Sequence, residues 1–167
     1  NMDFTPVIEF NKVTIYIFGD EFILSNDVTG GLIWIAAATI LIASLIAMTK
    51  DNLKARLAYS TISQLSYIVL GAMMASKAGL MGASMHIAMH AFGKITLFFC
   101  AGAIFVATGK KYISQLNGLG RAMPWTMGAL AIGAMSVTGL PPTGGLLSKM
   151  YMILGAADAQ QFALLAV

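Results

Sequence analysis

The sequence predicts an all-α fold: a polytopic bundle of transmembrane helices in which one helix is discontinuous. Hydrophobic residues make up 58% of the chain and charged residues only 10%, against about 25% charged residues in an ordinary globular domain. Residues 30–49 carry no charged side chain, and about 20 such residues suffice for one membrane crossing. Lys and Arg are also concentrated in alternate loops, as the positive-inside rule requires. The single cysteine, Cys100, excludes an intrachain disulfide framework.

The first 29 residues form a poorly assigned N-terminal piece that ends in an acidic link. The apolar segment Val13–Phe18 is too short to span a bilayer, so we expect a strand or the end of a helix there. The chain starts at Asn1 without a start methionine and stops at Val167 within an apolar run. We therefore expect a fragment of a larger membrane subunit.

Residues 30–167 are expected to form the transmembrane domain. Its spans are predicted at about residues 30–49, 57–75, 80–107 and 123–154, with a truncated span from about residue 161. Hydroxyl and amide side chains crowd the first half of the second span, including Ser60, Ser63 and Gln64. Such groups either hydrogen-bond to neighbouring helices or help to hold a water-filled path.

The fourth span is interrupted by the sequence GLPPTGG at Gly139–Gly145. Proline and glycine at this density free backbone groups that a regular helix would pair. In a membrane such a break survives where protein or water satisfies those groups, and transporters place ion sites at breaks of this kind. We predict a discontinuous helix built on Gly139, Pro141, Pro142, Gly144 and Gly145.

The charge pattern predicts the orientation of the chain. Residues 50–56 and residues 108–122 each contain three Lys or Arg side chains, whereas the intervening turn contains only Lys77. The two basic loops should face the cytoplasm, or the mitochondrial matrix in an organelle. We expect a multi-pass protein of the bacterial inner (cell) membrane, with a short interfacial helix at Tyr112–Leu119.

A row of ionisable side chains marks the third span. His86, His90 and Lys94 stand four residues apart, so each step turns only about 40° and all three share one helix face. Ionisable groups inside a membrane are a functional-site hypothesis by default, and with water between them they form a plausible proton relay. Alternatively, either histidine bonds a backbone carbonyl. A metal site is not expected, because the third member of the row is a lysine.

Lys149 follows the break by only a few residues, which places it near the middle of the membrane. We favour a functional role for it over a side chain that snorkels to the surface. Lys54 is interpreted as a topology determinant that supports the polar path. No catalytic triad, phosphate-binding loop, haem motif or iron–sulfur motif is visible. We therefore expect no catalysis by the chain itself, no cofactor and no nucleic-acid partner.

Three motifs, in this order and spacing, resemble a known family. They are DNLKARLAYSTISQ at residues 51–64, HIAMHAFGK at residues 86–94 and GLPPTGGLLSKMY at residues 139–151. The chain resembles the proton-translocating antiporter-like subunits shared by Mrp-type multisubunit cation/proton antiporters and respiratory complex I, over residues from about 30 to 155. GLGRAMP and the SKMY ending are most similar to the D-type Mrp subunit and its paralogues.

The resemblance implies a subunit of about fourteen helices with two inverted five-helix repeats, of which this chain is most of the second. It implies that Lys149 ends a central polar axis and that Lys94, His90 and His86 connect towards it. The family's glutamate–lysine pair in the first repeat has no counterpart in these residues.

We accordingly expect a subunit of a multisubunit monovalent cation/proton antiporter. Its expected partners are protons, Na⁺, other membrane subunits and the lipid bilayer. The alternative is a proton-pumping subunit of respiratory complex I or of a membrane-bound hydrogenase-type complex, where redox chemistry elsewhere drives the same relay. A scaffold without transport is a third reading, against which the buried ionisable residues argue. An isolated channel is disfavoured because no ring of acidic residues is visible.

Overall fold

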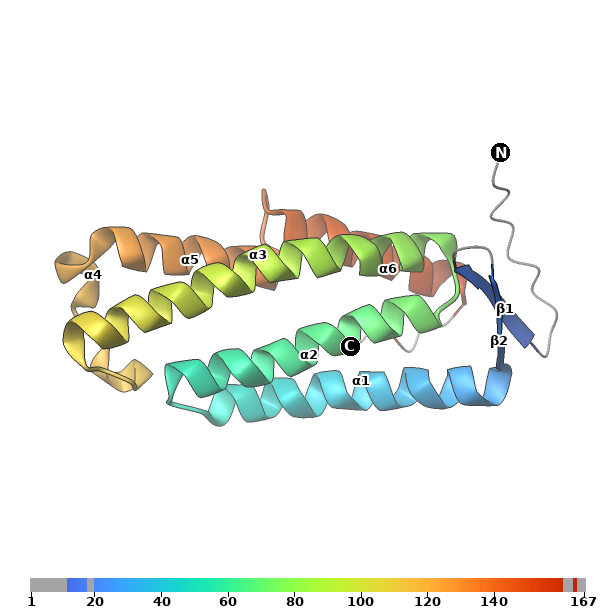
Figure 1. Ribbon diagram of the computed structural model, residues 1–167, viewed down its shortest axis with the longest axis horizontal. Coiled ribbons are helices and arrows are strands. Elements are labelled where there is room, and N and C mark those ends of the chain that lie inside the picture. The colour runs from blue at the N-terminus through green and yellow to red at the C-terminus, as the bar shows by residue number, and fades with distance from the viewer. Residues whose placement is uncertain (1–11, 18–19, 161–163, 165–167) are drawn as a thin grey trace.

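The computed structural model describes residues 12–17, 20–160 and 164, and Figure 1 shows their arrangement. Long helices lie alongside one another in an elongated bundle, and a small β-hairpin stands at one end. The elements are β1 Lys12–Ile17, β2 Asp20–Ser25, α1 Asn26–Thr49, α2 Leu53–Met73, α3 Lys77–Thr108, the 3₁₀ turn η1 Ile113–Gln115, α4 Leu119–Ala122, α5 Pro124–Thr138 and α6 Gly144–Asp158.

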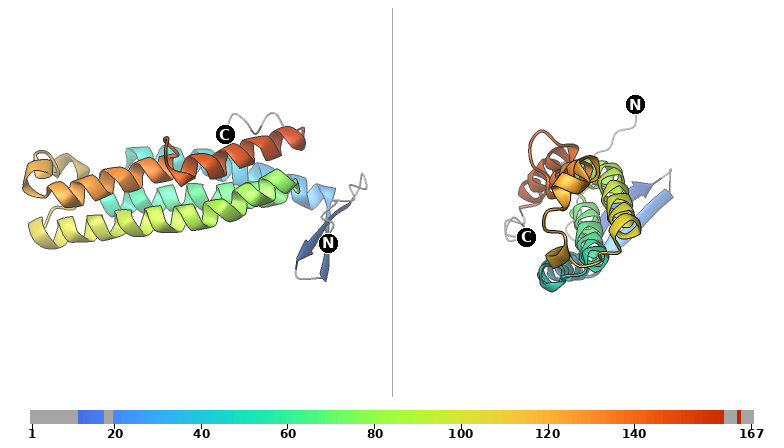
Figure 2. Two further views of the ribbon diagram at one scale, coloured as in Figure 1. Left: turned by 90° about the horizontal axis from the view of Figure 1, so that it is seen from above. Right: turned by 90° about the vertical axis from the view of Figure 1, so that its left-hand side faces the viewer.

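The bundle is organised around α3, which packs against α2, α5 and α6, while α1 packs against α2. Figure 2 shows α5 and α6 following one another along the length of the bundle as the two halves of one interrupted helix. One apolar cluster joins α1, α2 and α6 around Ile40 and Leu70, and a second joins α2, α3 and α5 around Leu97 and Val137.

The turn between α1 and α2 is closed by polar side chains. The Asn52 side chain accepts hydrogen bonds from the backbone N–H groups of Lys54 and Ala55 at 3.1 and 3.2 Å, which caps α2. The Arg56 guanidinium donates to the carbonyl oxygens of Ala47 and Met48, near the end of α1, at 3.1 and 3.0 Å. These carbonyls have no partner within α1 itself, so the arginine satisfies them.

The two basic loops meet at the same end of the bundle (Figure 1). Ser114 donates its hydroxyl and its backbone N–H to the Asp51 carboxylate at 2.7 and 3.1 Å. The expected interfacial helix at Tyr112–Leu119 is instead the turn η1 followed by the four-residue α4. Gly118, in the left-handed conformation with φ 78°, explains this, because an α-helix cannot run through such a residue.

The N-terminal hairpin realises one of the two alternatives left open by the sequence. Its strands pair antiparallel from Lys12 opposite Ser25 to Ile17 opposite Asp20. The helical fold predicted from the sequence describes the rest of the chain from Asn26 to Asp158. The truncated span expected from about residue 161 falls outside the described residues.

The break lies at the predicted place but is shorter than expected. Helix α5 ends at Thr138 and is capped by Gly139, which has φ 89°, a left-handed conformation that favours glycine. Helix α6 already begins at Gly144, so Gly144 and Gly145 belong to its first turn. Their role is close packing: an added Cβ at Gly145 would overlap the Ser136 carbonyl oxygen, and one at Gly144 would overlap the Met89 sulfur.

The exposed surface is far more apolar than that of a water-soluble protein, and several polar side chains are buried. Buried side chains include Ser63, Gln64, His86, His90, Lys94 and Ser148, while Trp125 is 92% exposed and Phe99 is 75% exposed. Two helices, α1 from Val28 and α3, are long and apolar enough to cross a membrane by length and composition. Polar groups inside and large apolar groups outside are typical of a helix bundle in lipid.

Candidate functional site

His86 lies where three helices meet and is only 1% exposed. Its Nδ1 atom is 3.0 Å from the Ser148 hydroxyl on α6, and its Nε2 atom is 2.9 Å from the side-chain amide oxygen of Gln64 on α2. Both ring nitrogens therefore have side-chain partners, and neither bonds a backbone carbonyl. The ring joins α2, α3 and α6 through hydrogen bonds, as expected for a polar group inside an apolar bundle.

His90 stands one turn further along α3. Its ring stacks on that of His86 with a centroid distance of 5.9 Å and an interplanar angle of 15°. The Nε2 atom of His90 is buried and has no hydrogen-bond partner among the described residues. A buried polar atom of this kind calls for a functional explanation, and this one lies between His86 and Lys94 in the row.

Lys94 is 5% exposed, and its Nζ atom donates to the Leu57 carbonyl oxygen on α2 at 3.1 Å. The Thr61 hydroxyl donates to the same carbonyl at 2.9 Å. The neighbouring Gly93 allows this arrangement, because a Cβ there would come within 2.7 Å of a Val137 methyl on α5. Lys94 thus ends the row next to the start of α2, towards the basic loops.

Lys149 on α6 is half-buried and reaches across the break to the end of α5. Its Nζ atom donates to the carbonyl oxygen of Thr138, the last residue of α5, at 3.0 Å. The last carbonyls of a helix have no partner within it and carry the negative end of the helix dipole. The Lys149 ammonium on α6 therefore satisfies the last carbonyl group of α5.

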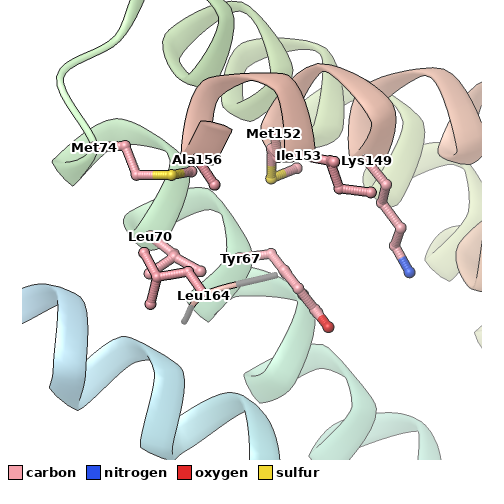
Figure 3. A pocket seen from close by; sticks show the side chains of 8 residues that line it. All are labelled: Tyr67, Leu70, Met74, Lys149, Met152, Ile153, Ala156 and Leu164. Atoms are coloured by element: carbon pink, nitrogen blue, oxygen red, sulfur yellow. The ribbon is translucent and has the colours of Figure 1, made fainter. Parts of the chain in front are cut away.

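Tyr67 on α2 lies between Lys149 and His86. The Lys149 Nζ atom is 5.4 Å from the centre of the Tyr67 ring, and that ring is 6.3 Å from the His86 ring, centre to centre. An ammonium over an aromatic face is attracted by the ring quadrupole. Tyr67 and Lys149 also line a pocket of about 200 Å³ between α2 and α6, and Figure 3 shows them together at one end of it.

The other predicted residues have different positions. Ser63 is buried on α2, and its hydroxyl lies 2.9 Å from the Ser44 hydroxyl on α1. Ser60 is half-buried on α2. Lys54 lies outside the polar row, with its Nζ atom 5.2 Å from the centre of the Phe105 ring.

Sequence reasoning missed Ser148 and Tyr67 as members of the site. It also missed the Leu57 and Thr138 carbonyl oxygens, which are the partners of the two lysines. Ser148 is 0% exposed, and a small polar residue beside Lys149 was the only signal for it. Within the part of the chain that the structure describes, no three His, Cys, Asp or Glu side chains gather as a metal site would require.

The chain matches the family model described as "NADH:quinone oxidoreductase/Mrp antiporter, TM" over residues 11–167. It is 42% identical over 134 residues to NADH-quinone oxidoreductase subunit N of Desulforudis audaxviator, covering 80% of this chain and 27% of that protein. The chain thus spans about a quarter of the length of this relative.

Two solved structures share the fold. The Mrp complex of a Dietzia species matches with a TM-score of 0.80 and 33% identity, over 83% of this chain and 26% of the other. The membrane-bound sulfane sulfur reductase, an archaeal respiratory membrane complex, matches with a TM-score of 0.75 and 33% identity, over 78% of this chain and 27% of the other.

Proposed function

Because the chain belongs to the NADH:quinone oxidoreductase/Mrp antiporter transmembrane family, an integral membrane family, we propose that it conducts protons along His86, His90, Lys94 and Lys149. The observation that supports this most directly is the buried row on α3. His86, His90 and Lys94 are each less than 9% exposed and lie inside an otherwise apolar helix. A row with no transport role has no reason to bear a cost of about 3 kcal/mol for each charge placed in the membrane centre.

The spacing of the row suits stepwise proton transfer. Successive members are one helical turn apart, about 6 Å along the axis, which a single water can bridge. The Nε2 atom of His90, which has no partner among the residues that the structure describes, is the point at which such a water would bond. Since like charges placed close together in a low-dielectric interior cannot all persist, a proton on one member favours release from the next.

Lys149 adds a step that is linked to the broken helix. As an ammonium it forms a charge-assisted hydrogen bond to the Thr138 carbonyl oxygen. As a neutral amine it loses that assistance and the attraction of the Tyr67 ring. The protonation state of Lys149 is therefore coupled to the contact between the two half-helices, so a proton transfer at Lys149 would change how tightly α5 and α6 are joined.

Two driving forces are compatible with this relay. Cation/proton antiport, with Na⁺ as the exchanged cation, is supported by the Mrp-type motifs and by the fold shared with the Dietzia Mrp complex. Redox-driven pumping is favoured by the 42% identity to an NADH-quinone oxidoreductase subunit. In either case the subunit would work beside other membrane subunits in the bacterial cell membrane, with the basic loops on the cytoplasmic side.

The test uses inverted membrane vesicles that contain the full-length subunit and its partners. A proton gradient is built, Na⁺ is added, and the wild type is compared with Lys94→Ala and Lys149→Ala. Lys77→Ala, an exposed lysine at the start of the same helix as Lys94, is the matched control. Antiport predicts that Na⁺ collapses the gradient in the wild type and the control but in neither relay variant.

Other outcomes separate the alternatives. If Na⁺ has no effect and NADH builds a gradient that both relay variants fail to build, redox pumping replaces antiport and the relay stands. If the relay variants match the wild type in both assays, the proposed relay is wrong, and a scaffold role without transport is favoured.

A further inference from the structure

Three buried hydrogen bonds around His86 form one continuous chain. They run from the Gln64 Oε1 atom to His86 Nε2 at 2.9 Å, from His86 Nδ1 to the Ser148 hydroxyl at 3.0 Å, and from that hydroxyl to the Gly145 carbonyl oxygen at 3.0 Å. Gln64, His86 and Ser148 are all buried. The chain links α2, through α3, to the first turn of α6 just after the break.

The number of protons in this chain can be counted. The two ends of the hydrogen-bond chain are the side-chain oxygen of Gln64 and the backbone carbonyl oxygen of Gly145. Both accept hydrogen bonds and cannot donate, so three bonds need three protons from the groups between them. A neutral imidazole and a serine hydroxyl supply two, whereas an imidazolium and the hydroxyl supply three. In this orientation of Gln64, proton uptake by His86 completes the chain and proton release leaves one bond unmade.

A rotation of the Gln64 amide removes that deficit. Its oxygen and nitrogen ends have nearly the same shape, so the flipped amide can place an N–H group opposite His86 Nε2. The neutral ring then accepts from Gln64 and donates from Nδ1 to Ser148, which in turn donates to the Gly145 carbonyl oxygen. The hydrogen-bond chain has three satisfied bonds again, and the His86 ring carries one proton fewer.

We propose that Gln64 is a two-position residue that satisfies His86 in both of its protonation states, with Ser148 fixing the other end of the ring. The amide presents its oxygen to the imidazolium and its nitrogen to the neutral ring. Proton release by His86 is then accompanied by the flip, and no buried partner is left unpaired in either state. This inference rests on the proposed function, because it describes how one member of the relay loads and unloads a proton.

The surroundings of His86 make an amide partner important. The titratable groups that face it are His90 on its own helix, Tyr67 on α2 and Lys149 on α6. Helices α2 and α3 contain no Asp or Glu, and α6 contains only Asp158, its last residue. No carboxylate near His86 on these helices can therefore balance a proton on its ring, and within them the balance comes from neutral dipoles such as the Gln64 amide.

The test introduces Gln64→Glu and Gln64→Leu into the full-length complex in proteoliposomes. A carboxylate at position 64 accepts in both orientations and should hold the proton on His86. We expect the pH profile of proton transport to move by about one pH unit or more to alkaline pH, a tenfold change in proton affinity. Gln64→Leu should lower the transport rate by about tenfold. Ser66→Ala on the same helix, whose hydroxyl donates to the Ile62 carbonyl oxygen of its own helix, should leave the profile in place.

A spectroscopic readout keeps the inference separate from the transport reaction. With ring-labelled histidine and carbonyl-labelled glutamine, infrared difference spectra across the titration should show the glutamine carbonyl band shifting together with a histidine band. Both changes should vanish in His86→Phe. A glutamine band that stays constant while His86 titrates would overturn the proposed flip even if transport is normal. If the wild type transports no protons but the two bands still shift together, the proposed function fails and the flip stands.

Discussion

Lys149 and Thr138 hold the two halves of the broken helix together, through a 3.0 Å hydrogen bond from the lysine Nζ atom to the threonine carbonyl oxygen. The bond needs a donor at position 149, and a relay needs a donor that can also lose its proton. Lysine meets both needs, whereas arginine meets only the first, because its guanidinium stays protonated.

Replacement of Lys149 should therefore separate stability from transport. Lys149→Met should lower the free energy of unfolding by up to about 1.5 kcal/mol, the lower end of the range for a hydrogen bond to a charged group, because the bond is exposed, and should abolish proton transport. Lys149→Arg should keep most of the stability and still abolish transport. Thermal unfolding and vesicle assays on the full-length subunit measure the two effects, and a transporting arginine variant would contradict the relay role.

Gly93→Ala should loosen the contact between α3 and α5. An added Cβ would lie 2.7 Å from a Val137 methyl, and overpacking of this kind usually costs about 1–3 kcal/mol. Gly102→Ala is the matched control, because it lies in the same helix and its Cβ would meet nothing within 4 Å. Equal melting temperatures for the two variants would show that α5 packs differently from the arrangement described above.

The link between the basic loops should depend on pH. Hydrogen bonds from the Ser114 hydroxyl, and then from its backbone N–H, hold the pKa of Asp51 below its ordinary value of 3.8. A lowered pKa in the folded state means that this contribution to stability is complete above about pH 4 and is lost as the pH falls through the folded-state pKa.

Cysteine crosslinking between the two loops should accordingly weaken in acid. Ser114→Ala should make the link less sensitive to acid by removing the hydroxyl contact while the backbone N–H contact remains. Asp51→Asn should make the link insensitive to acid by removing the titrating group. If crosslinking in both variants falls with acid as it does in the wild type, another group controls the link.

The predicted orientation can be tested by labelling single cysteines. Lys111→Cys should react with an impermeant thiol reagent from the cytoplasmic side, and Lys77→Cys should react from the opposite side. The native Cys100 is buried and is replaced by alanine to remove background. Labelling of both positions from one side would rule out the alternating topology inferred from the Lys and Arg counts.

Sequence patterns predicted those features of the structure that depend on neighbouring residues along the chain. The row of His86, His90 and Lys94 followed from helical periodicity alone, and the break followed from proline and glycine chemistry. The partners of these residues could not be predicted in the same way. The acceptors for Lys94 and Lys149 are backbone carbonyls, and any residue type would supply those.

The extent of the break was also beyond the reach of the sequence. Gly144 and Gly145 read as helix breakers, but neighbouring atoms fill the space that their side chains would need. Which of these two roles a glycine has depends on what packs against it. That information lies in α3 and α5, which are separate helices from the one that these glycines begin.

The position of Tyr67 between His86 and Lys149 has a thermodynamic consequence. The lysine ammonium and the histidine ring both lie near one aromatic ring, at 5.4 and 6.3 Å from its centre, so a charge on one influences the other. Coupling between two binding sites is reciprocal: the factor by which a proton on His86 weakens proton binding at Lys149 equals the factor in the opposite sense. If the proposed relay operates, such a pair is reversible, and the ion gradient or redox reaction coupled to it would set the direction of net proton flow.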